Sequence, residues 1–388
     1  MKKKISILGS TGSIGKTLIE ILKKDKKHFS IELLSTNQNY KELLKQVKFF
    51  NVKNIIVTNN KSFLIIKKIL KKKKINVYND FSKINDIFKK KTIDYTMSAI
   101  TGLDGLDPTL KFIKHTKNIA IANKESIICG WSLISSELKK FKTKFIPIDS
   151  EHFSIWSLTD NIDNKNIEKI FITASGGPFL SYPLHKFKSI KKEEALKHPK
   201  WKMGKKISID SATMMNKIFE VIEAKKIFSY DYNKIEIITH PQSYVHAIVK
   251  FTNGLTKILT HDTNMTIPIF NSLYPKFKKK IKSKSLDIST LNNLNLKKIN
   301  HTRYPVVKLL KSLPIKDSLY ETVIVAANDE LVKMFLDDRI KFTEISKFLL
   351  KIANKSIFKK YKQIRPINIK QIKMLSDYVS LKINTMVV

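Results

Sequence analysis

Short apolar runs alternate with amphipathic, lysine-rich stretches through the first 150 residues. We predict strands at residues 5–8, 31–34, 55–57, 75–78, 95–97 and 119–122, and a further short strand at 145–148. Parallel strands need crossover connections, usually helices, so strands that alternate with helices favour a mostly parallel sheet with helices on both faces. Residues 1–150 are therefore predicted to form a Rossmann-like α/β sheet.

The first turn of this region holds three glycines, Gly9, Gly12 and Gly15, between a predicted strand and a helix from Ile14 to about Lys24. The spacing is G-x-x-G-x-x-G rather than the usual G-x-G-x-x-G, and the whole chain has only 10 glycines. Glycines let the backbone approach a pyrophosphate, and the helix N-terminus adds free N–H groups and the positive end of the helix dipole. The turn therefore predicts a dinucleotide site.

Two further loops follow predicted strands at the sheet edge where ligands bind in parallel α/β folds. The loop at 34–39 has neither an acidic residue for an NAD ribose nor a basic residue for the extra phosphate of NADP, so it leaves the choice of cofactor open. The strand at 119–122 runs into Asn123-Lys124-Glu125-Ser126, where Lys124 suits an anionic or hydroxyl-rich substrate. A surface lysine at a helix start is the alternative reading.

Two carboxylates, Asp149 and Glu151, follow the apolar run at 145–148. On an extended backbone, side chains two residues apart point to the same side, so these carboxylates would repel each other. They would then need a proton, a cationic side chain or a metal ion between them, and hard oxygen ligands suit Mg²⁺ or Mn²⁺. The alternative is a solvated acidic turn.

The chain changes character from about residue 151. A strand at 167–171 leads into the small-residue loop Ser175-Gly176-Gly177-Pro178, whose hydroxyl and N–H groups suit an anion, although a plain tight turn uses the same residues. Trp201, Met203 and Gly204 then lie among lysines, which suggests a loop that closes over a ligand; an ordinary surface loop is the alternative.

A helix capped by Ser211 is predicted next. Thr213, Asn216, Lys217 and Glu220 fall on one face of this helix, at spacings of three and four residues. A polar helix face is usually exposed to solvent. Adjacent Asn, Lys and Glu side chains also suit a site that holds a phosphate and a metal together, and Glu220 would be a third carboxylate for the pair at 149 and 151.

The later chain divides by composition and pattern. Strands are expected at 235–239 and 245–252, residues 275–300 are rich in Lys, Ser and Asn, and the remainder is helical in pattern. We predict a nucleotide-binding domain at 1–150, a central α+β catalytic domain at 151–280, a linker at 281–300 and a C-terminal helical domain at 301–388.

The formal net charge of +40 raises the question of nucleic-acid binding. Only Arg303, Arg339 and Arg365 are arginines, and base readout favours arginine, so we expect a solvated lysine surface with no specific nucleic-acid partner. No apolar run reaches about 18 residues, so no membrane span is expected. The one cysteine, Cys129, excludes a disulfide framework and fits a reducing cytoplasm.

These pieces together resemble the 1-deoxy-D-xylulose 5-phosphate reductoisomerase family. The matching stretches are residues 7–15, 122–126, 148–152, 175–179, 198–220 and 240–243, and the run Asp210-Ser-Ala-Thr-Met-Met-Asn-Lys217 is the most specific. The C-terminal helices match only loosely. The resemblance implies an NADPH-dependent homodimer that requires Mg²⁺, Mn²⁺ or Co²⁺. It would convert 1-deoxy-D-xylulose 5-phosphate to 2-C-methyl-D-erythritol 4-phosphate in the non-mevalonate isoprenoid pathway.

The resemblance also implies roles for individual residues. The implied metal ligands are Asp149, Glu151 and Glu220, and the implied catalytic residues are these three with Lys124 and His198. The implied NADPH contacts are Thr11, Gly12, Ser13, Ile14, Asn37, Gln38, Asn39, Asn123, Glu125 and Gly204. The implied substrate contacts are Lys124, Ser150, Glu151, Ser175, His198, Ser211, Asn216, Lys217 and Glu220, with Ser175, Ser211, Asn216 and Lys217 on the phosphate.

Two features refine this resemblance. Trp201 and Met203 would belong to a closing flap. Asn37-Gln38 departs from the family, because relatives commonly carry a Gly and a basic residue there, and this departure bears on the tightness of NADPH binding.

The implied chemistry starts with a metal ion that polarises the substrate carbonyl. A retro-aldol and an aldol step would then move the carbon skeleton to a branched aldehyde, which NADPH reduces, while the distant phosphate anchors the substrate. Two other functions stay open at this point: a different metal-dependent NAD(P) oxidoreductase of a phosphorylated sugar, and a basic nucleic-acid-binding protein.

Overall fold

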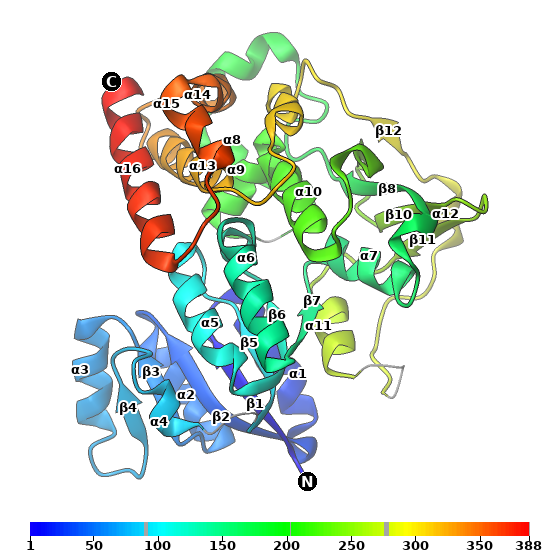
Figure 1. The fold of residues 1–388 in the computed structure, drawn as a ribbon. Coiled ribbons are helices and arrows are strands. Elements are labelled where there is room, and N and C mark those ends of the chain that lie inside the picture. Colours follow the sequence, from blue (N-terminus) through cyan, green and yellow to red (C-terminus); the bar gives the residue numbers. More distant parts are fainter. Residues whose placement is uncertain (89–91, 202, 275–278, 388) are drawn as a thin grey trace. The chain divides into compact units, whose positions relative to one another are not determined.

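The computed structural model describes residues 1–88, 92–201, 203–274 and 279–387 (Figure 1). Lys202, within the predicted flap, lies outside the described residues. The chain divides into two compact units. The first comprises Met1–Ile127, Ser132–Asp149 and Met265–Ile281, and the second comprises Ile128–Trp131, Ser150–Asn264 and Lys282–Val388.

A seven-stranded sheet forms the centre of the first unit, and every neighbouring pair of its strands is parallel. Its strands are β1 (Lys3–Leu8), β2 (Phe29–Thr36), β3 (Asn54–Val57), β4 (Asn76–Tyr78), β5 (Ile93–Ser98), β6 (Thr116–Ile121) and β7 (Lys144–Pro147). The strand order is β4-β3-β2-β1-β5-β6-β7, so the order reverses between β1 and β5. The predicted Rossmann-like parallel sheet is confirmed, and ligands of such sheets bind at the carboxyl edge near this reversal.

Helices connect these strands and bury their apolar faces. They are α1 (Ser13–Lys24), α2 (Tyr40–Phe50), α3 (Asn60–Ile69), α4 (Ile84–Ile87), α5 (Leu106–Ile113) and α6 (Lys124–Phe141). The later helix α11 (Thr266–Leu273) belongs to the same unit and packs against α1. In α1, Leu18, Ile19 and Leu22 are buried while Lys16 and Lys24 are exposed, as expected for an amphipathic helix on a sheet. Short 3₁₀ turns lie at Lys26–His28 and Leu103–Gly105.

A five-stranded sheet lies in the second unit, in the order β11-β10-β8-β9-β12. Its strands are β8 (Ile167–Ala174), β9 (Ile235–Thr239), β10 (Val245–Phe251), β11 (Thr256–Thr260) and β12 (Lys297–Lys298). Only β8 and β9 pair in parallel; the other pairs are antiparallel. The predicted central α+β region is therefore confirmed as a fold class.

The helices of the second unit include a C-terminal group. They are α7 (Ser150–Thr159), α8 (Lys192–Ala195), α9 (Lys205–Thr213), α10 (Met215–Phe228), α12 (Ile288–Asn292), α13 (Tyr320–Leu336), α14 (Phe342–Asn354), α15 (Ser356–Lys359) and α16 (Ile369–Val387). The 3₁₀ segments are Asn164–Asn166, Leu184–Ser189, Tyr232–Lys234, Pro305–Ser312 and Lys360–Gln363. Helix α13 is buried over most of its length and packs against α14 and α16 (Figure 1).

The C-terminal helical region is confirmed, and no helix within the described residues is long and apolar enough to cross a membrane. Within the predicted linker, β12 pairs with β9. The division into three domains with a linker stays a prediction.

Two local predictions are wrong. Asp149-Ser150-Glu151 does not stay extended, because β7 ends at Pro147 and α7 begins at Ser150. Ser211 does not cap a helix: it lies inside α9, and Met214 in the left-handed region separates α9 from α10.

One buried ion cluster joins α10 to the start of α13. Lys226 donates to Asp317 at 2.5 Å and lies 3.1 Å from Glu321, and the side chains of Lys226 and Glu321 are only 3% and 2% exposed. Burial alone would lower the pKa of Lys226, but Glu321 and Asp317 raise it above its ordinary value. The ammonium group therefore stays charged and neutralises a buried carboxylate.

We predict that Lys226→Ala lowers the free energy of unfolding by about 3 kcal/mol, because it leaves Glu321 buried without its cation. Urea titration measures this change. The control is Lys250→Ala, which removes an ion pair of 2.6 Å with Glu168 whose side chains are 44% and 47% exposed. That pair should contribute less than about 1 kcal/mol. Equal losses in the two variants would contradict a structural role for the cluster.

Candidate active site

The glycine turn between β1 and α1 has the backbone that close approach of a ligand requires. Gly9 has a φ of +82°, and a Cβ atom there would lie 2.7 Å from the carbonyl oxygen of Ala99. A Cβ atom on Gly15 would lie 2.4 Å from the carbonyl oxygen of Gly9. Gly12 is the N-cap of α1 and supplies no side-chain cap, so the first N–H groups of the helix are open to an anion.

The other predicted NADPH contacts in the first unit surround this turn. Thr11 lies in the turn, where its hydroxyl oxygen is 2.6 Å from that of Thr36, and Ser13 and Ile14 begin α1. Asn37 and Gln38 are exposed after β2, and Asn39 caps α2 by accepting from the N–H of Glu42 at 3.2 Å.

Asn123 caps α6 in the same way and ties neighbouring loops together. Its Oδ1 accepts from the N–H of Ser126 at 2.6 Å, and its Nδ2 donates to the carbonyl oxygens of Gly102 and Ile100. Lys124 and Glu125 follow in the first turn of α6, and the ammonium group of Lys124 donates to Asp149 at 2.5 Å. Asparagine side chains therefore set the starts of α2 and α6 at the carboxyl edge of the sheet.

Acidic side chains gather where β7 gives way to α7. Asp149 immediately precedes α7, Glu151 lies in its first turn, and Glu220 lies on α10. Each offers one carboxylate oxygen, and these three oxygens lie within 4.8 Å of one another. Glu151 is 8% exposed and Glu220 is 1% exposed, so their charges are largely removed from water.

Lys217 bridges two of these carboxylates. Its ammonium group donates to Glu220 at 2.6 Å and also to Glu151. Burial alone would lower the pKa of Lys217, but Glu151 and Glu220 raise it above its ordinary value. Neighbouring amide and hydroxyl groups complete the cluster, since Asn216 donates to Glu220 at 2.5 Å and Ser150 donates to Glu151 at 2.6 Å.

The polar face predicted for this helix is thus buried instead of solvent-exposed. The break at Met214 makes Asn216 and Lys217 first-turn residues of α10, where the N–H groups and the helix dipole favour anions. Thr213 is the last residue of α9 and therefore not part of α10, and its hydroxyl donates to the carbonyl oxygen of Ile209 at 3.0 Å.

Ser175 and His198 form a second polar group in the same unit. The loop after β8 turns through Gly176 and Gly177, which have φ values of +84° and +64°. A Cβ atom on Gly177 would lie 3.0 Å from the carbonyl oxygen of Ser211, so this loop lies close against α9. Ser175 Oγ accepts from the N–H of Gly177 at 3.1 Å and lies 3.0 Å from His198 Nε2.

The hydrogen bonds of His198 fix its tautomer. Its Nδ1 accepts from the N–H groups of Lys200 at 3.1 Å and Trp201 at 2.9 Å, so the ring proton must be on Nε2. Burial, and then the positive charge of Lys217, lower the pKa of His198 to about 4. The neutral ring therefore donates from Nε2 to Ser175 Oγ, which leaves the hydroxyl proton of Ser175 to point elsewhere.

The predicted flap residues occupy different surroundings. Gly204 is the N-cap of α9, and a Cβ atom there would meet nothing within 4 Å. Trp201 is half-buried and packs edge-on against His246, with ring centroids 6.3 Å apart. His246 in turn stacks on His261, with ring centroids 3.6 Å apart.

Sequence reasoning missed two residues beside the acidic group. His152 and Glu223 form a second possible set of metal ligands with Asp149, again with ligand atoms within 4.8 Å. The His152 Nε2 donates to the backbone carbonyl of Glu220 at 2.9 Å. The sequence held a signal for both: His152 directly follows Glu151 on α7, and Glu223 lies three residues after Glu220 on α10.

Comparison with known proteins identifies the family. Three family models match: 1-deoxy-D-xylulose 5-phosphate reductoisomerase at residues 5–130, its C-terminal domain at 145–228, and the DXP reductoisomerase C-terminal domain at 261–378. The 1-deoxy-D-xylulose 5-phosphate reductoisomerase of Pelagibacter ubique (strain HTCC1062) is 63% identical over 385 residues, covering 99% of each chain. That of Wolbachia pipientis wMel is 40% identical and covers 88% of each chain.

Solved structures agree over the whole chain. The Zymomonas mobilis enzyme in complex with NADPH superposes with a TM-score of 0.89 at 28% identity, covering 100% of this chain and 99% of that one. A DOX-P reductoisomerase in complex with NADPH, fosmidomycin and magnesium has a TM-score of 0.89 at 27% identity, covering 99% and 98%. The chain belongs to the 1-deoxy-D-xylulose 5-phosphate reductoisomerase family.

Proposed function

We propose that this protein converts 1-deoxy-D-xylulose 5-phosphate to 2-C-methyl-D-erythritol 4-phosphate, using NADPH and a divalent metal ion. The observation that carries the proposal is the buried group of Glu151, Lys217 and Glu220 in a member of this family. Metal-ligating carboxylates and a phosphate-binding cation come from the same pair of helices, as a phosphorylated, metal-chelating substrate requires.

Asp149, Glu151 and Glu220 are the proposed ligands of the metal ion. Their oxygens are near enough to share one ion, and hard carboxylate oxygens suit Mg²⁺ or Mn²⁺. A bound ion would act as a Lewis acid on the substrate carbonyl. Ser150 donates to Glu151 Oε2 and Asn216 donates to Glu220 Oε1, the carboxylate oxygens that Lys217 does not use. Metal-ligating carboxylates usually have such supporting hydrogen bonds.

The β1–α1 turn is the proposed seat of the NADPH pyrophosphate. Gly9 and Gly15 leave no room for a side chain, and Thr11, Gly12, Ser13 and Ile14 present backbone N–H groups at the start of α1. The further proposed NADPH contacts are Asn37, Gln38, Asn39, Asn123, Glu125 and Gly204. NADPH supplies the hydride that reduces the rearranged aldehyde.

The proposed phosphate anchor consists of Ser175, Ser211, Asn216 and Lys217, with His198 alongside. Because His198 donates to Ser175 Oγ, the serine can direct its own proton to a phosphate oxygen. The Nδ1 of His198 meanwhile accepts from backbone N–H groups of the predicted flap, so the anchor and the flap share one side chain. Lys124 and Ser150 are proposed to contact the substrate backbone.

Lys217 has to exchange partners in this scheme. Its ammonium group pairs with Glu151 and Glu220, the same two carboxylates that are proposed to bind the divalent ion, so the two cations compete for them. Once the ion binds, the displaced ammonium group becomes available to the substrate phosphate. Metal binding would therefore prepare the phosphate anchor.

Two further expectations, the cellular compartment and the oligomeric state, also belong to this proposal. The chain would act in the cytoplasm as a homodimer, in keeping with the family resemblance. A single cysteine suits a reducing compartment. Analytical ultracentrifugation of the purified protein tests the dimer, since a single species at the monomer mass of 44.9 kDa would exclude it.

The direct test of the function is an assay of NADPH oxidation with 1-deoxy-D-xylulose 5-phosphate. Purified protein should consume NADPH and form 2-C-methyl-D-erythritol 4-phosphate, EDTA should stop turnover, and added Mn²⁺ should restore it. The unphosphorylated sugar should be a poor substrate, because the phosphate anchor supplies binding energy for orientation. Metal-independent turnover, or none at all, would contradict the proposal.

Glu220→Gln should weaken Mn²⁺ binding at least about tenfold, since one of three anionic ligands loses its charge while the shape is kept. Isothermal titration calorimetry with Mn²⁺ measures this. Glu236→Gln, at a 38% exposed carboxylate, is the matched control and should bind Mn²⁺ as the unmodified protein does. Equal metal affinity in both variants would remove Glu220 from the proposed ligands.

Lys217→Ala should raise the KM for 1-deoxy-D-xylulose 5-phosphate at least about tenfold, because the phosphate loses a charge-assisted contact. Its affinity for Mn²⁺ should not fall, because the competing ammonium group is gone. Lys225→Ala, on the same helix, is the control for both measurements. If Lys217→Ala weakened metal binding and left the KM unchanged, the proposed exchange of partners would be wrong.

The low pKa of His198 gives a pH-dependent contribution to stability. The folded chain has a His198 pKa of about 4, below the ordinary 6.5, so only the unfolded chain takes up this proton between those values. The contribution is complete above about pH 6.5 and is lost as the pH falls toward 4. From pH 7 to pH 5, the unmodified protein should lose roughly 1 kcal/mol more than His198→Gln.

Urea titrations at the two pH values measure this difference. His185→Gln, at an exposed histidine, is the control and should lose as much as the unmodified protein. An identical loss in His198→Gln would mean that the neutral ring does not contribute to folding stability at pH 7.

A further inference from the structure

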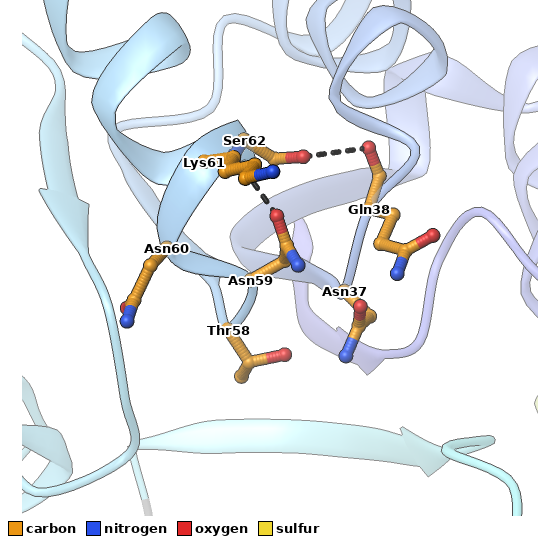
Figure 2. A pocket seen from close by; sticks show the side chains of 7 residues that line it. All are labelled: Asn37, Gln38, Thr58, Asn59, Asn60, Lys61 and Ser62. Atoms are coloured by element: carbon orange, nitrogen blue, oxygen red, sulfur yellow. Dashed lines mark hydrogen bonds between the residues drawn. The ribbon is translucent and has the colours of Figure 1, made fainter.

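A polar pocket of about 720 Å³ opens at the carboxyl ends of β2 and β3 (Figure 2). Residues of two successive loops line it: Asn37 and Gln38 after β2, and Thr58, Asn59, Asn60, Lys61 and Ser62 after β3. In a dinucleotide-binding sheet, the far end of the nucleotide reaches the loop after the second strand. The pocket therefore lies where the adenosine ribose of a bound dinucleotide would be expected.

Hydrogen bonds hold the two loops together. Asn59 caps α3 by accepting from the N–H of Ser62 at 3.1 Å, and the Ser62 hydroxyl donates to the carbonyl oxygen of Gln38 at 3.1 Å (Figure 2). The N–H of Thr58 also donates to the carbonyl oxygen of Thr36 at 3.1 Å. These hydrogen bonds fix the two loops to each other, so the lining side chains are presented from defined positions.

Lys61 is the one charged residue among those that line the pocket. It is exposed, and no carboxylate forms an ion pair with it in the described part of the chain. No acidic residue lies in the first turn of α3, so the helix dipole adds to the positive potential there. The loop after β2 offers only the neutral amides of Asn37 and Gln38.

We propose that Lys61 supplies the cation that binds the 2′-phosphate of NADPH and so selects NADPH over NADH. The inference rests on the proposed function. The cation that an NADP-binding fold usually carries after its second strand comes here from the start of the helix after the third strand. Asn37 and Gln38, from the facing loop, donate neutral hydrogen bonds to the same ribose phosphate.

The test compares the affinities of Lys61→Ala for NADPH and NADH, measured by fluorescence titration at one fixed ionic strength. The Kd for NADPH should rise about tenfold, as for loss of one charge-assisted phosphate contact, and the Kd for NADH should change less than about twofold. Lys68→Ala, at an exposed lysine on α3 that does not line the pocket, should change neither value. The fragments 2′,5′-ADP and 5′-AMP should repeat the pattern.

A charge-rescue variant makes the test independent of folding. Adding Gln38→Lys to Lys61→Ala returns a cation to the pocket from the opposite loop, and it should restore most of the preference for NADPH. An unchanged ratio of the NADPH and NADH affinities in Lys61→Ala would overturn the inference. Failure of the unmodified protein to bind NADPH would instead overturn the proposed function, so the two failures are distinguishable.

Discussion

The bridge that Lys217 makes between Glu151 and Glu220 is the interaction on which the second unit's site depends. Two carboxylates that are 8% and 1% exposed cannot both stay ionised at this distance without a cation. Lys217 and Glu220 are three residues apart on α10, so one helix face supplies both the acid and its neutraliser. The cation is therefore a requirement of folding as much as a candidate for substrate binding, which is why it is buried when most lysines here are exposed.

A second consequence follows from where α10 begins. The left-handed residue Met214 ends α9 and restarts the chain as a new helix, which brings Asn216 and Lys217 into a first turn. First-turn N–H groups and a lysine favour an anion, whereas the carboxylates one turn on favour a metal ion. One helix thereby provides neighbouring positions for the anionic phosphate of a sugar phosphate and for a metal ion that its hydroxyl and carbonyl oxygens would chelate. His198 adds a further connection. Its Nδ1 accepts hydrogen bonds from the backbone N–H groups of Lys200 and Trp201, and its Nε2 donates to Ser175.

The parallel sheet could be predicted from the sequence, because strands buried on both faces are continuous apolar runs. The glycine turn after β1 could also be predicted, because its glycines follow a strand and precede a helix. The metal-ligand candidates were also recognisable. The break at Met214 was not, since a methionine with positive φ has no sequence signal. The extended backbone expected at Asp149–Glu151 was wrong because an apolar run does not show at which residue a strand ends and the next helix begins. Burial of the polar face on α10 depends on packing against elements distant in sequence, which periodicity cannot reveal.

The abundance of lysine explains why the sequence alone did not indicate Lys61 as a binding residue. With 73 basic residues in the chain, a single lysine at a helix start carries almost no information. Position in the fold restores that information: Lys61 is the sole charge in a polar pocket, whereas Lys68 on the same helix does not line it. In a lysine-rich chain, a lysine on a neighbouring loop can supply the cation that binds a phosphate. A phosphate is recognised by the positive charge near it, whichever loop carries that charge. If Lys61 binds the 2′-phosphate as proposed, the positive charge that is expected after β2 comes instead from the loop after β3, within the same pocket.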